Sequence, residues 1–198
     1  MGRRALLLLL AAVAVTASPA LAHSGAGVAG GFASGFSHPL GGLDHMLAMV
    51  AVGIWGAFLG RPLIWALPVA FPLIMVVGGV AGIMNMPLPY VETGIAASVI
   101  GLGLAIALAW RAPAAAAVAV VSVFALFHGY AHGKELPEAA APEAFAAGFV
   151  VATGLLHLAG IGLGLLIGMR GGGTILRFAG GAIALTGVWL IAGAPGLA

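Results

Sequence analysis

Residues 38–59 read HPLGGLDHMLAMVAVGIWGAFL, a stretch that begins with ionisable side chains and continues as an apolar segment. Counted from Pro39 to Leu59, the segment is close to the roughly 20 residues that a helix needs to cross a bilayer core. Ionisable side chains are costly inside a membrane, and membrane proteins that keep them there generally use them for function. We therefore expect a membrane helix that carries a functional polar end.

The composition of the whole chain agrees with a membrane setting. Of its 198 residues, 63% are hydrophobic and only 6% are charged, whereas about a quarter of the residues in a soluble domain are charged. The seven basic residues are scattered and form no patch for nucleic acid. Cysteine is absent, which excludes disulfides, thiolate catalysis and sulfur-rich metal sites. A metal would need His, carboxylate, Met or backbone ligands, which suit divalent ions such as nickel, cobalt, copper or zinc.

The first 22 residues have the three-part pattern of a secretory signal peptide. Arg3 and Arg4 precede an apolar run, and Ala20-Leu21-Ala22 resembles a cleavage site. The alternative is an uncleaved first helix. Cleavage after Ala22 would leave His23 as the N-terminus, where its amine and its ring could bind one metal ion. A disordered terminal residue is the simpler interpretation of His23.

Residues 23–198 are expected to form one domain of six transmembrane helices, so the predicted fold is an all-α polytopic membrane helical bundle. Residues 23–36 are too weakly apolar for a span and are interpreted as an extracytoplasmic lead-in. Proline, glycine and arginine separate the spans. The predicted spans are Pro39–Leu59, Leu63–Met84, Val91–Trp110, Pro113–His132, Glu143–Met169 and Thr174–Ala192.

The charges predict how these spans are oriented. With the N-terminus outside, one set of loops holds Arg61, Arg111, Arg170 and Arg177, and the other holds Glu92, Lys134, Glu135, Glu138 and Glu143. The positive-inside rule places the arginines in the cytoplasm. We therefore expect a protein of the bacterial cytoplasmic membrane, with both mature termini on the extracytoplasmic side.

Glycines at four-residue spacing predict close helix contacts. Gly78 and Gly82 form one such pair, and Gly160, Gly164 and Gly168 form a second row. Small residues let helix backbones approach each other where lipid provides no hydrophobic drive for association.

A second polar stretch, FHGYAHGKE at residues 127–135, ends the fourth predicted span. His128 and His132 share a helix face about 6 Å apart along the axis, a spacing that allows both imidazoles to bind one metal ion. Glu135 either continues this face or closes the mouth of the site if Gly133 ends the helix. The predicted topology places this stretch at the same membrane face as residues 38–45.

The first stretch needs a break to bring its ligands together. His38 and His45 would lie about 10 Å apart on an unbroken helix. Because residues before proline avoid helical dihedrals, Pro39 predicts that His38 lies outside the regular helix, and two glycines weaken the next turn. Asp44 either binds the metal directly or accepts a hydrogen bond from an imidazole and fixes its tautomer.

Three further polar or sulfur-bearing side chains have simpler interpretations. Met46 and Met49 are most simply core residues. His157, near the centre of the fifth span, is either hydrogen-bonded to a neighbouring helix or a deeper stopping point for an ion. For both polar stretches, the structural alternative is a hydrogen-bonded network that braces two helices.

Together, these residues resemble the HupE/UreJ family, small membrane permeases for nickel and in some members cobalt. The family pattern of His, five residues and Asp-His matches His38, Asp44 and His45, and the second family pattern matches FHGYAHGKE. The resemblance extends over nearly the whole chain. It implies a permease that supplies nickel enzymes such as hydrogenase or urease.

We therefore predict a secondary transporter, not an enzyme, that takes Ni²⁺ or Co²⁺ from the periplasmic side. Its expected metal ligands are His38, Asp44, His45, His128, His132 and Glu135, with weaker candidates in His23 and His157. The ion is the substrate, and no permanently bound cofactor is expected. Uptake should weaken as the imidazoles protonate below about pH 6.

The expected partners are the metal ion, the lipid bilayer and proteins that mature nickel enzymes. Other classes stay open at this stage: a metal-binding accessory protein without transport, an intramembrane metallohydrolase or a haem-binding cytochrome. The metallohydrolase would need a general base, and no carboxylate lies between His128 and His132.

Overall fold

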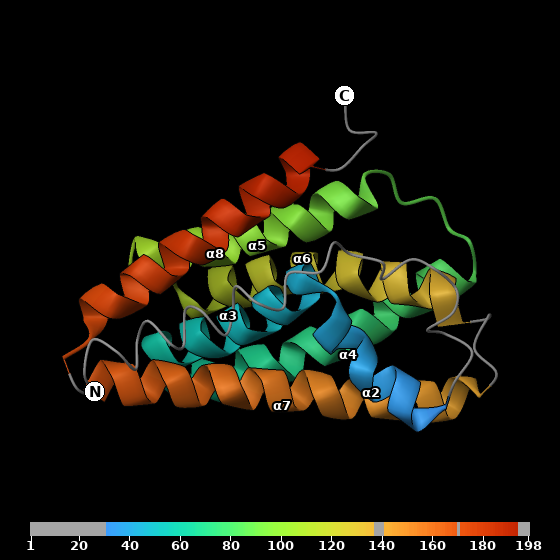
Figure 1. Cartoon of the computed structure of the whole chain (residues 1–198), viewed down its shortest axis with the longest axis horizontal. Helices are drawn as coiled ribbons and strands as arrows, with labels where there is room; N and C mark the ends of the chain where they lie inside the picture. The colour runs from blue at the N-terminus through green and yellow to red at the C-terminus, as the bar shows by residue number, and fades with distance from the viewer. Residues whose placement is uncertain (1–30, 137–140, 170, 194–198) are drawn as a thin grey trace.

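The computed structural model describes residues 31–136, 141–169 and 171–193. Within these ranges the chain forms seven helices and no strands (Figure 1), which confirms the predicted all-α class. The predicted signal peptide and His23 lie outside the described residues. The helices are α2 Phe32–Gly41, α3 Leu43–Leu59, α4 Leu63–Ile83, α5 Val91–Ala107, α6 Ala114–Glu135, α7 Pro142–Met169 and α8 Gly173–Gly193.

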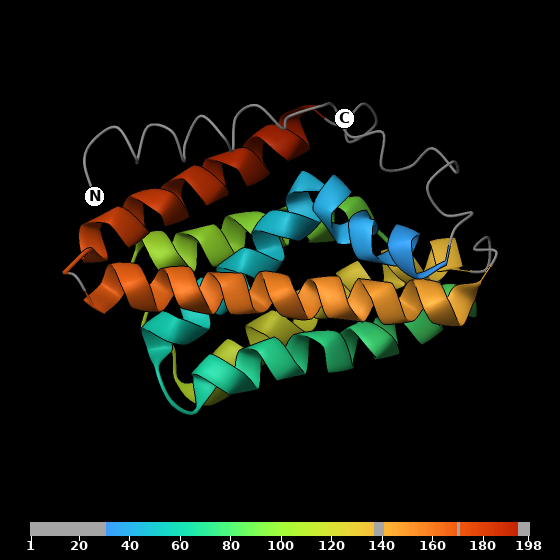
Figure 2. The ribbon, with the colours of Figure 1, turned by 60° about the horizontal axis from the view of Figure 1, so that its bottom comes forward.

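Helix α3 lies at the centre of the bundle. It packs against α7 on one side and against α4 and α5 on others, while α4 runs along α6 and α5 runs along α8. The long helix α7 extends the length of the molecule beside both α2 and α3 (Figures 1 and 2). Apolar residues of α3, including Met49, Val52 and Trp55, are fully buried, so this helix forms much of the core.

The first predicted span is in fact two helices. Helix α2 begins at Phe32, before the predicted start, and α2 and α3 are bent by 84° at Gly42. The break lies at Gly42, whose backbone is extended with φ −95° and ψ 114°, and not at Pro39. His38 therefore belongs to a regular helix, contrary to the prediction. Helix α2 begins at Phe32 and includes Pro39, and its packing along α7 accounts for this early start.

Four described helices are long and apolar enough to cross a membrane: α4, α6, α7 and α8. The bent pair α2 and α3 passes the same test only when taken together, and α5 is a shorter apolar helix. The described chain is thus a membrane protein. Six transmembrane helices stay a prediction.

Glycines make close contacts between the helices, which confirms the prediction at every named position except one. Added side chains at Gly78 and Gly82 would strike the backbone of α6, and one at Gly160 would strike the backbone of α3. Gly164 also lies against α3, whereas Gly168 has no neighbour within 4 Å and makes no such contact. Close backbone packing therefore holds α4 to α6 and α7 to α3.

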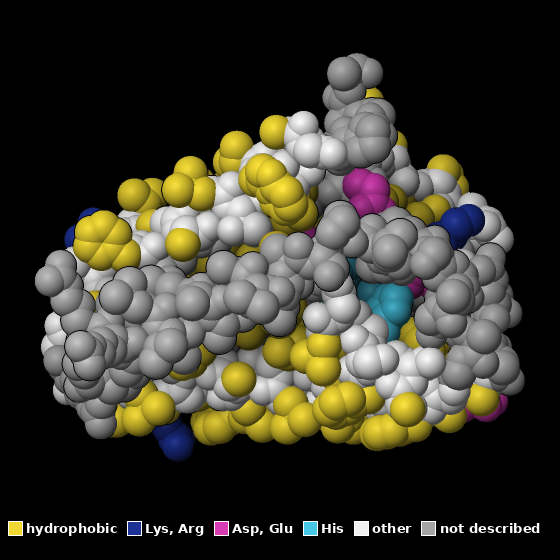
Figure 3. Space-filling model, viewed as in Figure 1, with side chains coloured by type: hydrophobic (Ala, Val, Ile, Leu, Met, Phe, Trp, Pro, Cys, Tyr) yellow, Lys and Arg dark blue, Asp and Glu magenta, His cyan; other side chains and the backbone are white. Residues whose placement is uncertain are grey.

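The exterior is largely apolar along the helices and polar at the ends. Large hydrophobic side chains of α4, α7 and α8, such as Leu73, Leu166 and Trp189, are exposed, and hydrophobic atoms cover much of the face in Figure 3. At one end, Arg177 donates a hydrogen bond to the carbonyl of Ala107. Histidine and carboxylate side chains gather toward the other end (Figure 3).

Candidate metal site

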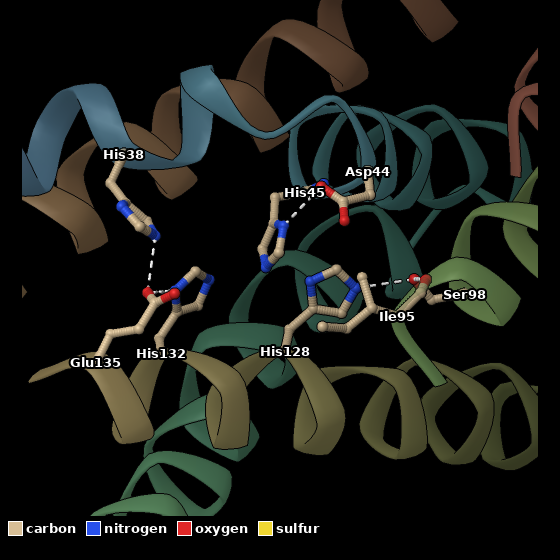
Figure 4. A network of polar contacts seen from close by, with 8 residues as sticks. All are labelled: His38, Asp44, His45, Ile95, Ser98, His128, His132 and Glu135. Carbon is tan, nitrogen blue, oxygen red and sulfur yellow. Dashed lines mark hydrogen bonds and ion pairs between the residues drawn. The ribbon is translucent and has the colours of Figure 1, made fainter. Parts of the chain in front are cut away.

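The bend between α2 and α3 places two histidines over one face of α6. His38 projects from α2 and His45 from the first turn of α3, while His128 and His132 rise from successive turns of α6 (Figure 4). The two polar stretches, far apart in the sequence, thus meet as predicted. We call His38, His45, His128 and His132, together with Asp44 and Glu135, the histidine cluster.

The outer part of the histidine cluster consists of His38, His132 and Glu135, whose ligand atoms all lie within 4.8 Å of one another. Oε2 of Glu135 is 3.1 Å from Nε2 of His38 and 3.5 Å from Nδ1 of His132. With metal–ligand bonds of about 2.1 Å, neighbouring ligand atoms lie about 3.0 Å apart in octahedral and about 3.4 Å apart in tetrahedral coordination. The three side chains are therefore spaced for one small divalent ion.

Asp44 fixes the tautomer of His45. Its Oδ1 accepts hydrogen bonds from the backbone N–H of His45 and from Nδ1 of the ring, both at 2.8 Å. Because a carboxylate only accepts, Nδ1 carries the proton and Nε2 keeps its lone pair. This Nε2 is buried and has no hydrogen-bond partner. Asp44 thus takes the second of its two predicted roles here.

Ser98 on α5 fixes the opposite tautomer of His128. The serine hydroxyl donates to the carbonyl of Ile95 at 2.6 Å, so its oxygen accepts from Nε2 of His128, which is 2.8 Å away. The Nδ1 atom of His128 therefore keeps its lone pair, and it too is buried without a partner. Figure 4 shows this nitrogen on the side of the ring that faces His45.

The imidazoles of the histidine cluster form a continuous group. The ring centroid of His45 lies 4.5 Å from that of His132 and 4.7 Å from that of His128, and His38 lies 4.9 Å from His132. Nε2 of His132 is buried without a hydrogen bond, and the buried Nδ1 has only the 3.5 Å contact with Glu135. A network built only to brace helices would satisfy these nitrogens, because an unpaired buried polar atom costs about 1–3 kcal/mol.

Exposure of the imidazoles falls from the outer to the inner part of the histidine cluster. The side chain of Glu135 is 25% exposed and that of His38 is 13% exposed, whereas His128 is completely buried. Phe145 and Phe149 of α7 cover one side, with the Phe149 ring 4.3 Å from that of His132. The outer part of the histidine cluster is therefore nearer to solvent than His128 is.

The glycines of the second polar stretch, residues 127–135, hold α6 against α4. Gly129 and Gly133, each directly after a motif histidine, lie against the backbone of α4 at Met75 and Gly79. Gly133 does not end the helix, which continues to Glu135. One face of α6 therefore packs on α4 while the adjacent face presents imidazoles to α2 and α3.

Two further residues from the sequence analysis, His157 and Met49, lie apart from the histidine cluster. His157 of α7 is buried beside Phe71. Its ring nitrogens have no hydrogen-bond partner among the described residues. The hydrogen bond to a neighbouring helix, one of its two predicted roles, is therefore not made there. Met49 is a fully buried core residue, as expected. The sequence analysis did not predict a role for Ser98. Its position as a polar residue within an apolar predicted span was a signal that could have identified it.

Comparisons with known proteins agree with this arrangement. A model of the family described as HupE / UreJ protein matches residues 10–190. The chain is also 45% identical over 182 residues to Protein HupE of Rhizobium leguminosarum bv. viciae, covering 91% of this chain and 95% of that protein. This chain belongs to the HupE/UreJ family. No solved structure matches it.

The family membership settles the broad class of this HupE/UreJ protein. The family comprises metal transporters and accessory proteins, so the chain is not an enzyme. Both motifs that carry the resemblance lie in the histidine cluster. A role in handling nickel or cobalt is consistent with the family and with the ligands gathered here.

Proposed function

We propose that this protein is a permease that carries Ni²⁺, or Co²⁺, across the bacterial cytoplasmic membrane toward nickel enzymes such as hydrogenase or urease. The observation that carries the proposal is the set of ligand atoms on His38, His132 and Glu135, which converge at the polar end of an apolar bundle. Imidazole nitrogen suits nickel and cobalt, and one carboxylate offsets part of the charge of the ion.

The buried lone pairs of His45 and His128 support movement of the ion inward. These nitrogens lie on rings next to the outer ligands, deeper in the bundle, and no protein group donates a hydrogen bond to them. A transport site must bind well enough to attract the ion and weakly enough to release it, which several successive ligand sets achieve. The arginines at the opposite end support entry from the extracytoplasmic side.

The test is uptake of ⁶³Ni²⁺ by proteoliposomes that contain the purified full chain. We expect His132→Ala to lower the initial rate at least about 10-fold, because this side chain contributes to the outer ligands and contacts His45. Thr186→Val is the matched control, because this hydroxyl bonds only to the carbonyl of Ala182 within its own helix. Nickel binding without flux in the wild type would favour an accessory protein and overturn the proposal.

A further inference from the structure

One face of α7 continues inward from the histidine cluster. Phe145, Phe149, Thr153 and His157 follow at four-residue intervals, so they form a row on this face. The first two rings contact His38 and His132. Each interval advances about 6 Å, which places Thr153 about 6 Å and His157 about 12 Å deeper than Phe149.

The two inner members of the row are polar side chains without partners. Thr153 and His157 are each 1% exposed. Neither the threonine hydroxyl nor either ring nitrogen of His157 has a hydrogen bond in this described part of the bundle. Threonine in a helix commonly bonds to a carbonyl one turn earlier, so its unused hydroxyl is notable. Buried unpaired groups at membrane depth are costly and generally serve a pathway.

Phe71 of α4 contacts both His157 and the histidine cluster. The ring of Phe71, which is fully buried, lies 5.5 Å from the ring of His128 and 5.4 Å from the ring of His157. The two imidazoles therefore contact the same phenyl ring, and His157, about 12 Å deeper than Phe149 along α7, is not one of the outer ligands. It occupies a separate position, further along the molecule.

His157 also lies between the two ends of the bundle. Its backbone carbonyl packs against Gly53 of α3, eight residues or about 12 Å beyond His45 along that helix. Near the arginine end, a recess of about 310 Å³ is lined by residues that include Ile54, Phe58 and Arg177. His157 is thus placed at an intermediate depth, between the histidine cluster and this recess.

We propose that His157 and Thr153 form a second, inner binding position for the transported divalent transition-metal ion, which rests on the proposed permease function. One neutral imidazole and one hydroxyl bind such an ion weakly, so the ion retains other ligands, such as water, and leaves readily. Brief binding of this kind suits an intermediate position on a pathway.

The test compares His157→Leu and Thr153→Val with the wild type in three measurements. These are ⁶³Ni²⁺ uptake by proteoliposomes, nickel affinity by titration calorimetry, and Tm in detergent. We expect His157→Leu to lower uptake at least about 10-fold while nickel affinity changes less than about 2-fold, because the outer ligands are intact. Thr153→Val, which preserves side-chain shape, should lower uptake less.

The Tm separates a transport role from a structural one. Because His157 has no partner, replacing it with leucine should leave the Tm equal to or above that of the wild type. Lost uptake with a lower Tm would show that the imidazole braces the bundle and would overturn the inference. Uptake equal to that of the wild type in both variants would overturn the inference alone. A wild type that binds nickel without carrying it would overturn the permease, and the inner position with it.

Discussion

The chemistry of the site depends on which nitrogen of each imidazole carries a proton. Asp44 holds the proton of His45 on Nδ1, and Ser98 holds that of His128 on Nε2. The free lone pairs are Nε2 of His45 and Nδ1 of His128, both buried. Two opposite tautomers thus leave acceptor nitrogens that only a cation or a donor can satisfy.

Ser98→Ala tests the contribution of the hydroxyl to this arrangement. Without an acceptor at Nε2, the ring of His128 is free to exchange tautomers, and nickel affinity should fall about 10- to 100-fold. Ser98→Thr, which keeps the hydroxyl, should bind nearly as well as the wild type. Titration calorimetry gives the affinity, and ¹⁵N NMR of the imidazole gives the tautomer. Equal affinity in Ser98→Ala would contradict the role assigned to Ser98.

Sequence patterns predicted all six members of the histidine cluster but left the role of Asp44 open and missed Ser98, the partner of His128. His128 and His132 are four residues apart on a long helix, so their shared face follows from helical geometry alone. Asp44 had two open roles, because the hydrogen bond to its neighbour depends on side-chain rotamers at a helix start. Ser98 is 30 residues from its partner, and such pairings depend on packing that local patterns do not contain.

At the scale of helices, the break at Gly42 decides whether α2 and α3 reach the same site. A side chain added at Gly42 would lie 2.9 Å from Oδ1 of Asp44 and 3.1 Å from Nδ1 of His45, whereas one at Gly41 would meet nothing within 4 Å. The prediction placed His38 outside the helix because of Pro39, and it expected Gly41 and Gly42 to weaken the next turn. Packing of α2 on α7 outweighs the effect of Pro39.

Gly42→Ala and Gly41→Ala form a matched pair for the break. The first should displace Asp44 from His45 and lower nickel affinity about 10-fold, because the carboxylate no longer fixes the imidazole. The second should leave nickel affinity unchanged. Both affinities are measured by calorimetry on the full-length protein. Equal binding by the two variants would show that the space at Gly42 does not govern the site.

The contact between α4 and α6 gives a second prediction at this scale. An alanine at Gly129 would overlap the backbone of Met75, so Gly129→Ala should lower the free energy of unfolding by about 1–3 kcal/mol. Gly162→Ala is the control, because that position has nothing within 4 Å. Thermal unfolding in detergent measures both. A Tm for Gly129→Ala no lower than that of the control would argue against close packing of these helices.

Over the whole molecule, most polar groups lie toward the two ends, with Thr153 and His157 between them. Tyr130 donates a hydrogen bond to the carbonyl of Met86 near the histidine cluster, while Arg111 lies over the ring of Phe58 at the other end. Apolar runs of about 20 residues predicted the helical class, because a helix of that length spans a bilayer with its backbone hydrogen bonds made within the segment. The 84° bend and the short α5 were not predictable from span length alone.

The orientation can be tested by labelling single cysteines, because the chain contains none. Met86, 52% exposed, and Met169, 75% exposed, lie at opposite ends. In intact spheroplasts, a membrane-impermeant maleimide should label Met86→Cys but not Met169→Cys, because the positive-inside rule places the arginine end in the cytoplasm. Permeabilised cells provide the control, in which both should react. The reverse pattern in intact spheroplasts would contradict the proposed direction of uptake.

The most direct measurement of the central claim is X-ray absorption at the nickel edge of the full-length protein, with any affinity tag removed. Wild-type protein loaded with Ni²⁺ should show scattering from at least two imidazole rings at metal–nitrogen distances of about 2.1 Å, and His132→Ala should lose part of it. A nickel spectrum without imidazole scattering, or one unchanged in His132→Ala, would contradict the site formed by α2, α3 and α6.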